Sequence, residues 1–145
     1  MKITKEQAAT IDRNEISSSE LTEEQEMYKE NIIDYYKHPR NKEELKDCTC
    51  KQREINPICG DEITLYMKVE KGIIKKASYT GKGCAISQAS ISMLTEKLKD
   101  MPIQEAKELK KEDIFEMLGI PISFVRTKCA LLSLKTLSKS LEETK

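Results

Sequence analysis

The sequence predicts a single α+β domain in which a small, three-stranded antiparallel sheet is packed by helices. Between Glu62 and Gly81, apolar and polar side chains alternate on either side of Lys71 and Gly72, which indicates two strands joined by a hairpin. From Ile86 onward, the apolar side chains recur at the longer spacing of helices. Strands followed by helices are typical of α+β folds, and 145 residues are enough for one hydrophobic core.

A helix is expected to open the domain. Thr22 and Gln25 fit a capping box at its start. The helix should end near Pro39, because proline disfavours helical geometry in the residue before it. The polar residues 1–21 are interpreted as a mobile N-terminal tail, which leaves residues 22–145 as the domain.

The remaining elements lie on either side of the hairpin. A third strand is expected near residues 49–56. Three helical segments follow the hairpin, at residues 86–99, at 103–118 with a break, and at 122–142. The last of them carries its core-facing side chains at helical spacing, at Ala130, Leu134, Leu137 and Leu141. Cys129 lies about 100° from this stripe, so its thiol is predicted on a flank of the C-terminal helix, where it can reach a partner outside the core.

Composition narrows the class of function. The chain has 25 basic and 25 acidic residues, and a formal net charge of zero gives no long-range attraction for nucleic acid or an anionic membrane. It contains no apolar stretch long enough for a signal peptide or a bilayer span, so we expect a soluble, cytoplasmic protein, either a monomer or a weak homo-oligomer. Five cysteines cannot all pair internally, and reduced thiols direct attention to metal or sulfur chemistry.

Two candidate ligands stand immediately before the first hairpin strand. Cys59 and Asp61 are two residues apart, so in extended backbone their side chains face the same side and can reach one metal ion. Gly60 between them has no Cβ and allows a ligand to approach closely. A turn with a buried small residue explains the same pattern without a ligand, because isolated cysteines are frequently inert core residues.

Two further thiols are associated with helices. Cys84 follows Gly81 and Gly83 and precedes a predicted helix, whose unpaired amides and positive dipole end favour a thiolate. The alternative is a small apolar residue that fills a crowded strand–helix junction. Arg126 lies three positions before Cys129, where its guanidinium can hold a thiolate or a bound persulfide, or else be an ordinary surface charge.

Three sulfurs and one oxygen make a candidate tetrahedral site, which suits zinc or one edge of an iron–sulfur cluster. The candidate ligands are Cys59, Asp61, Cys84 and Cys129. Cys48 and Cys50 lie in a charged connecting segment and are interpreted as exposed loop thiols rather than auxiliary metal or redox ligands. They are therefore left out of the site.

Four motifs in order resemble those of the iron–sulfur cluster assembly proteins of the IscU/SufU type, which also form the N-terminal part of NifU. The resemblance extends from about Tyr28 to Leu141 and covers nearly all of the predicted domain. The motifs are "YKENIIDYYKHPRN" (28–41), "NPICGDEITLYMKV" (56–69), "GKGCAISQASISML" (81–94) and "RTKCALLSLKTL" (126–137).

The resemblance implies a site and its partners. Cys59, Cys84 and Cys129 would ligate iron or a [2Fe–2S] cluster, with Zn²⁺ as the alternative or resting occupant. Asp61 would tune the lability of the cluster or complete the zinc site. Cys129, assisted by Arg126, is the candidate persulfide acceptor. The implied partners are a cysteine desulfurase and apo iron–sulfur acceptor proteins.

The chain also departs from the family pattern. IscU-type scaffolds have a histidine immediately before the third cysteine, whereas this chain has Lys128, and its sole histidine, His38, is interpreted as a surface residue. The chaperone-recognition sequence Leu-Pro-Pro-Val-Lys is replaced by "GIPISFVRTK" at 119–128. "RTKC" resembles SufU, yet the 45 residues from Cys84 to Cys129 leave no room for the insertion that SufU carries.

Two classes of function remain, and the first is preferred because the cysteine spacing follows the scaffold subtype. It is a non-catalytic scaffold that collects iron and sulfide and transfers a [2Fe–2S] cluster to acceptor proteins. The second is a SufU-like, zinc-dependent sulfurtransferase that accepts persulfide sulfur from a cysteine desulfurase. A structural zinc domain of a larger complex is a third alternative.

Overall fold

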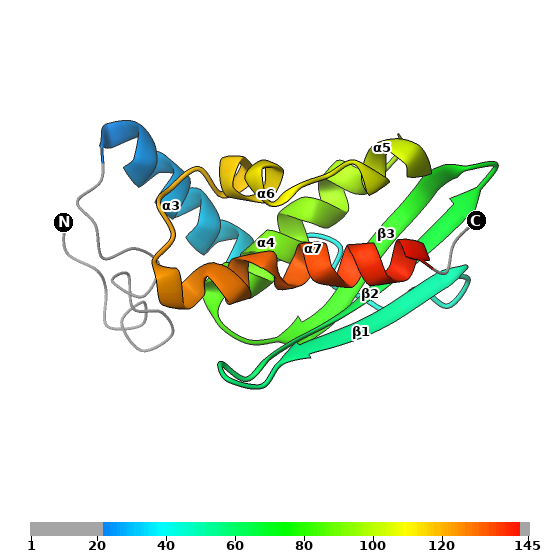
Figure 1. The fold of residues 1–145 in the computed structure, drawn as a ribbon, viewed down its shortest axis with the longest axis horizontal. Coiled ribbons are helices and arrows are strands. Elements are labelled where there is room, and N and C mark those ends of the chain that lie inside the picture. Colours follow the sequence, from blue (N-terminus) through cyan, green and yellow to red (C-terminus); the bar gives the residue numbers. More distant parts are fainter. Residues whose placement is uncertain (1–21, 143–145) are drawn as a thin grey trace.

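The structure is a computed structural model that describes residues 22–142, and it shows an antiparallel sheet with helices packed on one face (Figure 1). The strands lie in the order β1-β2-β3-β4, and they are β1 (Cys50–Asn56), β2 (Asp61–Glu70), β3 (Ile73–Lys82) and β4 (Met101–Pro102). The predicted α+β class is confirmed. The sequence prediction lacked β4, a two-residue strand that pairs with the start of β3. The predicted tail lies outside the described residues.

The first described helix, α3 (Glu23–Lys37), begins and ends where the sequence predicts. The capping box is present: the Gln25 amide donates to Thr22 Oγ1 at 3.1 Å, and the Thr22 amide donates to Gln25 Oε1 at 3.0 Å. These two bonds satisfy amides that a helix start leaves without partners. The helix stops two residues before Pro39.

The hairpin also forms as predicted. Lys71 and Gly72 both adopt positive φ, at 53° and 75°, which suits the tight turns that join right-twisted strands. On β2, alternate side chains face the helices, and Ile63, Leu65 and Met67 are fully buried there. The sheet therefore presents one apolar face on which the helices pack.

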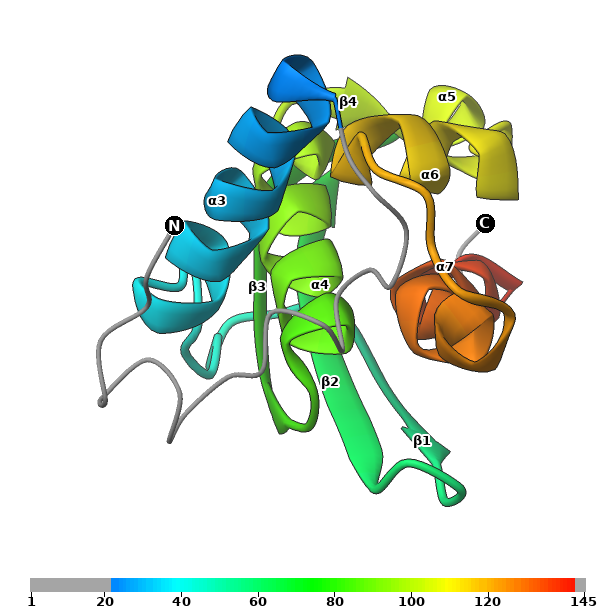
Figure 2. The ribbon, with the colours of Figure 1, turned by 90° about the vertical axis from the view of Figure 1, so that its left-hand side faces the viewer.

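Two long helices cover this face. They are α4 (Ala85–Leu98), which packs on β3, and α7 (Thr127–Glu142), which packs on β1 and β2 beside α4 (Figures 1 and 2). Helix α3 packs on α4, farther from the sheet. The predicted break within the segment 103–118 is confirmed, since it separates α5 (Ile103–Lys107) from α6 (Lys111–Leu118).

The C-terminal helix starts later than the sequence predicts. Residues 120–123 are not helical, and a short 3₁₀ turn, η1 (Phe124–Arg126), precedes Thr127. Gly119 ends α6 with a φ of 75°, and Pro121 then disfavours helical geometry in the residue before it. The prediction of a helix from residue 122 was therefore wrong by five residues.

The predicted flank position of Cys129 was also wrong, because its exposed fraction is 0%. Helix α7 packs against both the sheet and α4, so its buried face is wider than a single stripe of leucines. Between the two helices, Ser90 Oγ donates to the Ala130 carbonyl at 3.0 Å and lies 2.6 Å from Ser133 Oγ. These buried bonds fix the register of α7 on α4.

Candidate metal and sulfur site

Three segments that are far apart in the sequence meet at one end of the molecule. They are the turn between β1 and β2, the connection from β3 to α4, and the start of α7 (Figures 1 and 2). Each carries one of the predicted thiols: Cys59, Cys84 and Cys129. The fold thus brings the three cysteine motifs together at one end of the sheet.

The β1–β2 turn presents Cys59 and Asp61. Gly60 has a φ of 73°, and its amide donates to the Asn56 carbonyl at 2.9 Å, which closes the turn. Cys59 is partly exposed, whereas Asp61, the first residue of β2, is buried. Asp61 Oδ2 is buried without a hydrogen-bond partner among the described residues. A buried carboxylate oxygen is costly unless it is paired or binds a cation, so this atom fits a metal ligand.

The β3–α4 connection places Cys84 against Asp61. The main-chain amide of Cys84 donates to Asp61 Oδ1 at 2.8 Å. Gly83 makes this approach possible, because its φ is 147° and a Cβ there would overlap Asp61 Oδ1. Cys84 is the N-cap of α4, and its Sγ accepts from the Ser87 amide at 3.5 Å. The prediction that this thiol lies at a helix start is confirmed.

Cys129 lies in the first turn of α7, fully buried, and two donors point at its sulfur. Asn56 Nδ2 lies 3.9 Å from Cys129 Sγ, and Arg126 Nη1 lies 4.0 Å from it. Burial raises the pKa of the Cys129 thiol well above its usual value, and the neighbouring Asp61 and Cys84 act in the same direction. In this site the Cys129 sulfur therefore becomes a thiolate when a cation replaces its proton.

The ligand atoms of Cys59, Asp61 and Cys129 all lie within 4.8 Å of one another. The Cys84 sulfur falls outside this group. The hydrogen bond from the Cys84 main-chain amide to Asp61 nevertheless holds the residue beside the group. Of the four predicted ligands, three thus converge and the fourth adjoins them. Two soft sulfurs and one hard oxygen form a donor set that zinc and iron both accept.

The residues excluded from the predicted site lie elsewhere. His38 is the exposed residue that follows α3. Cys48 lies in the loop before β1, and Cys50 begins β1 at the end opposite Asn56. The interpretation of Cys50 as an exposed loop thiol was wrong, because it is the first residue of a strand and is packed partly against the core.

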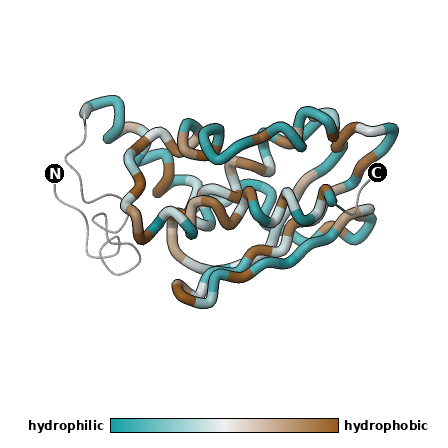
Figure 3. The backbone as a smooth tube through the Cα atoms, in the orientation of Figure 1, coloured by the Kyte–Doolittle hydropathy of each residue, from teal (hydrophilic) through white to brown (hydrophobic). Residues whose placement is uncertain are grey.

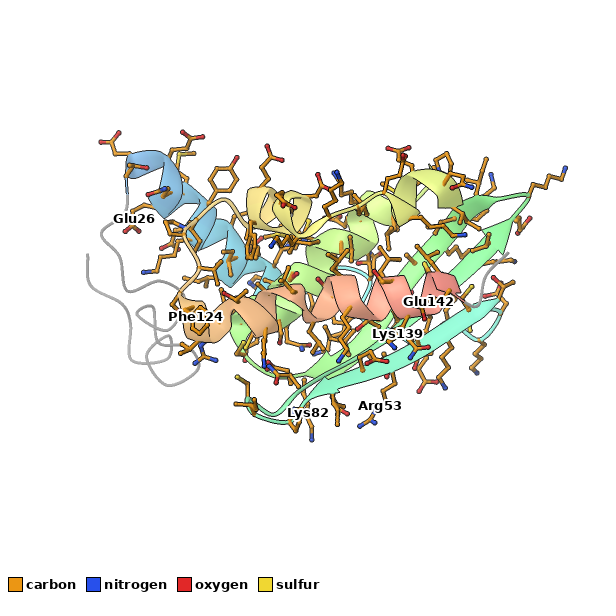
Figure 4. All side chains as sticks on the ribbon, viewed as in Figure 1. Glu26, Arg53, Lys82, Phe124, Lys139 and Glu142 are labelled. Carbon is orange, nitrogen blue, oxygen red and sulfur yellow. The ribbon has the colours of Figure 1, made fainter. Side chains whose placement is uncertain are left out.

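An apolar groove that the sequence did not predict borders Cys59. Its volume is about 310 Å³, and it is lined by Asn56, Ile58, Cys59, Phe124, Val125, Thr127 and Lys128. The side chain of Phe124 is 93% exposed, and it stands at the end of the molecule where α7 begins (Figure 4). Hydrophobic colouring also marks the β1–β2 turn in Figure 3. The available signal was the apolar residues placed directly beside "CGD" and "RTKC".

An antiparallel sheet covered on one face by helices, with thiols and a buried carboxylate gathered at one end, defines a class of small metal- and sulfur-binding domains. The chain belongs to the family described as the NifU-like N terminal domain, whose model matches residues 27–144. The family resemblance expected from the four motifs is confirmed.

Individual relatives carry two different names. The chain is 36% identical over 132 residues to the "Zinc-dependent sulfurtransferase SufU" of Bacillus subtilis, covering 79% of this chain and 89% of that protein. It is 36% identical over 133 residues to the "Iron-sulfur cluster assembly scaffold protein IscU" of Thermotoga maritima, covering 81% and 94%.

A solved structure shares the fold. It is a putative iron–sulfur cluster assembly scaffold protein for the SUF system from Fervidobacterium islandicum, with a TM-score of 0.66 and 29% identity, covering 77% of this chain and 94% of that one. Among the described helices of the present structure, none is both long and apolar enough to cross a membrane.

Proposed function

We propose that this protein is an iron–sulfur cluster assembly scaffold, which binds iron and sulfide and passes a [2Fe–2S] cluster to acceptor proteins. The proposal rests on the convergence of the Cys59, Asp61 and Cys129 ligand atoms within 4.8 Å of one another. Cys84 lies beside them because its main-chain amide donates a hydrogen bond to Asp61. The scaffold relatives in the same family support it.

The ligands of the site differ in exposure, which suits a site that first holds a cluster and then releases it. Cys129 and Asp61 are buried, whereas Cys59 and Cys84 are partly exposed, so an incoming acceptor thiol meets the cluster on the Cys59 and Cys84 side. Three thiolates and a carboxylate bind a cluster less firmly than four thiolates do. Transfer to an acceptor with four cysteines is therefore downhill.

A second function, zinc-dependent sulfur transfer, is favoured by one contact. Arg126 Nη1 lies 4.0 Å from Cys129 Sγ, and a cation in this position stabilises an anionic sulfur species. The relative named as a zinc-dependent sulfurtransferase supports this alternative. Zn²⁺ held by the three thiols and Asp61 would supply a positive charge that keeps the thiols deprotonated at neutral pH.

In this alternative Cys59 is a better persulfide acceptor than Cys129, because Cys59 is partly exposed and Cys129 is fully buried. The Cys59 thiolate would attack the terminal sulfur of the donor's persulfide. A new S–S bond forms on Cys59, the donor's S–S bond breaks, and the donor cysteine leaves as a thiolate. The transferred sulfur keeps its proton or releases it to solvent, so no external oxidant or reductant is needed.

The apolar groove beside Cys59 is the proposed docking surface for the cysteine desulfurase. A sulfur donor that binds there places its persulfide next to an exposed thiol, and Phe124 supplies a large apolar side chain for contact. Phe124→Ala should lower the stimulation of the desulfurase about tenfold. Met27→Ala is the matched control, since Met27 is also an exposed apolar residue but lies on α3. Equal stimulation by both variants would contradict docking at the groove.

The two functions are separated by the metal that the protein holds. Protein purified without oxygen should contain iron and sulfide and show charge-transfer absorption if it is a scaffold. Stoichiometric zinc without such absorption, together with sulfur accepted on Cys59, would instead establish the transferase. Protein that binds neither metal would contradict both.

A further inference from the structure

Asn56 contacts both the turn that carries Cys59 and the sulfur of Cys129. It is the last residue of β1, its exposed fraction is 7%, and its side-chain Nδ2 lies 3.9 Å from Cys129 Sγ. Its main-chain carbonyl accepts the Gly60 amide at 2.9 Å, in the turn that carries Cys59. We propose that Asn56 is a positioning residue for the site, which holds the Cys129 sulfur in place and donates an N–H···S hydrogen bond to its thiolate.

The strand explains why this contact occurs. Side chains at alternate positions of β1 face α7, and Asn56 is the last of them, with Gln52 and Glu54 before it. In the ladder with β2, Asn56 pairs directly with Asp61. Asn56 thus stands between the Asp61 strand end and the first turn of α7. One residue contacts the Cys59 turn through its main chain and Cys129 through its side chain.

The chemistry of an amide suits this role. A thiolate is a stronger hydrogen-bond acceptor than a thiol, so the bond gains strength when a metal displaces the Cys129 proton. The amide is neutral, which distinguishes it from the positively charged Arg126 guanidinium on the same sulfur. Hydrogen bonds to a ligating sulfur orient it and reduce its electron donation to the metal. Asn56 therefore makes Cys129 a well-fixed but weaker donor.

This inference rests on the proposed metal binding, so Co²⁺ is the probe, because its thiolate complexes absorb visibly. The test compares Asn56→Leu with the wild type. Leucine keeps the approximate shape of asparagine but lacks the donor, and the main-chain bond to Gly60 remains. Gln52→Leu is the matched control, since Gln52 is a side-chain amide on the same face of β1 that donates to Glu54 Oε2 at 2.7 Å.

We expect Asn56→Leu to weaken Co²⁺ binding about 10- to 100-fold, because the Cys129 sulfur is no longer held in place. The variant should also shift the sulfur-to-cobalt charge-transfer band to lower energy, because a thiolate without this hydrogen bond donates more strongly. Gln52→Leu should leave both unchanged. The band position is a readout that a merely structural role would not move. If Asn56→Leu does not fold, Asn56→Ala provides the same comparison.

The outcomes distinguish this inference from the proposed function. Wild-type affinity and an unshifted band in the Asn56 variant would overturn the role of Asn56 and leave metal binding intact. A wild-type protein that fails to bind Co²⁺ would overturn the proposed function and, with it, this inference.

Discussion

The main-chain amide of Cys84 donates a hydrogen bond to Asp61 Oδ1 at 2.8 Å, which joins the start of α4 to the start of β2. One carboxylate oxygen is thereby engaged, and the other, Oδ2, is left buried and available to a metal. The bond also keeps Cys84 beside the three converging ligand atoms. The geometry of the site therefore depends on the close approach of two backbone segments.

Gly83 permits this approach, so Gly83→Ala should disrupt it. A Cβ would overlap Asp61 Oδ1 and lie 2.9 Å from Asp61 Cα, which displaces the carboxylate. We expect at least a tenfold loss of Zn²⁺ affinity in a competition titration. Gly72→Ala is the control, because Gly72 has a φ of 75° but open space around it. That variant should lose about 1 kcal/mol of unfolding free energy and bind Zn²⁺ normally. Equal Zn²⁺ affinities in the two variants would contradict this reading.

Asp61→Ala should have opposite effects in the two proposed functions. Asp61 is a hard ligand among soft thiolates, and the resemblance to the scaffold family implies that its removal slows cluster release. The variant should therefore lengthen the lifetime of a reconstituted [2Fe–2S] cluster in the presence of an acceptor. In a sulfurtransferase, the same change should weaken zinc retention. Cluster decay followed by visible absorption measures the first, and chelator competition measures the second. Faster cluster decay in the variant would count against the scaffold.

The cysteines should divide into two groups. Replacement of Cys59, Cys84 or Cys129 by Ser should abolish stable metal or cluster binding, because each removes a proposed ligand. Cys48→Ser and Cys50→Ser should retain it, since both residues precede or begin β1 at the end opposite Asn56. Metal content after desalting is the measurement. Loss of metal in Cys48→Ser as complete as in Cys84→Ser would show that the site is drawn wrongly.

Arg126→Ala should separate the scaffold from the transferase. Arg126 lies 4.0 Å from the Cys129 sulfur, which lies within 4.8 Å of the Cys59 sulfur. The positive charge of Arg126 is therefore close enough to stabilise an anionic persulfide on Cys59. In a scaffold supplied with ferrous iron and sulfide, the variant should reconstitute a cluster as the wild type does. In a transferase, it should lower desulfurase stimulation about tenfold, or about 1.4 kcal/mol. Normal behaviour in both assays would make Arg126 an ordinary surface charge.

Features that depend on neighbouring residues were predictable from the sequence. The capping box of Thr22 and Gln25 and the hairpin turn at Lys71 and Gly72 use hydrogen bonds and backbone angles within a few residues. The position of Cys84 at a helix start has the same local origin. The family resemblance rested on motifs of this kind, and it supplied the ligand set that spacing alone left open.

Tertiary packing decided what local pattern could not. The burial of Cys129 follows from α7 packing on the sheet and α4 together, whereas helical periodicity gives only the angle between side chains. Asn56 and Cys129 are 73 residues apart, so their contact exists only after β1 and α7 have docked. The local sequence pattern indicates which residues form each helix or strand. The faces on which these elements pack determine which side chains come into contact.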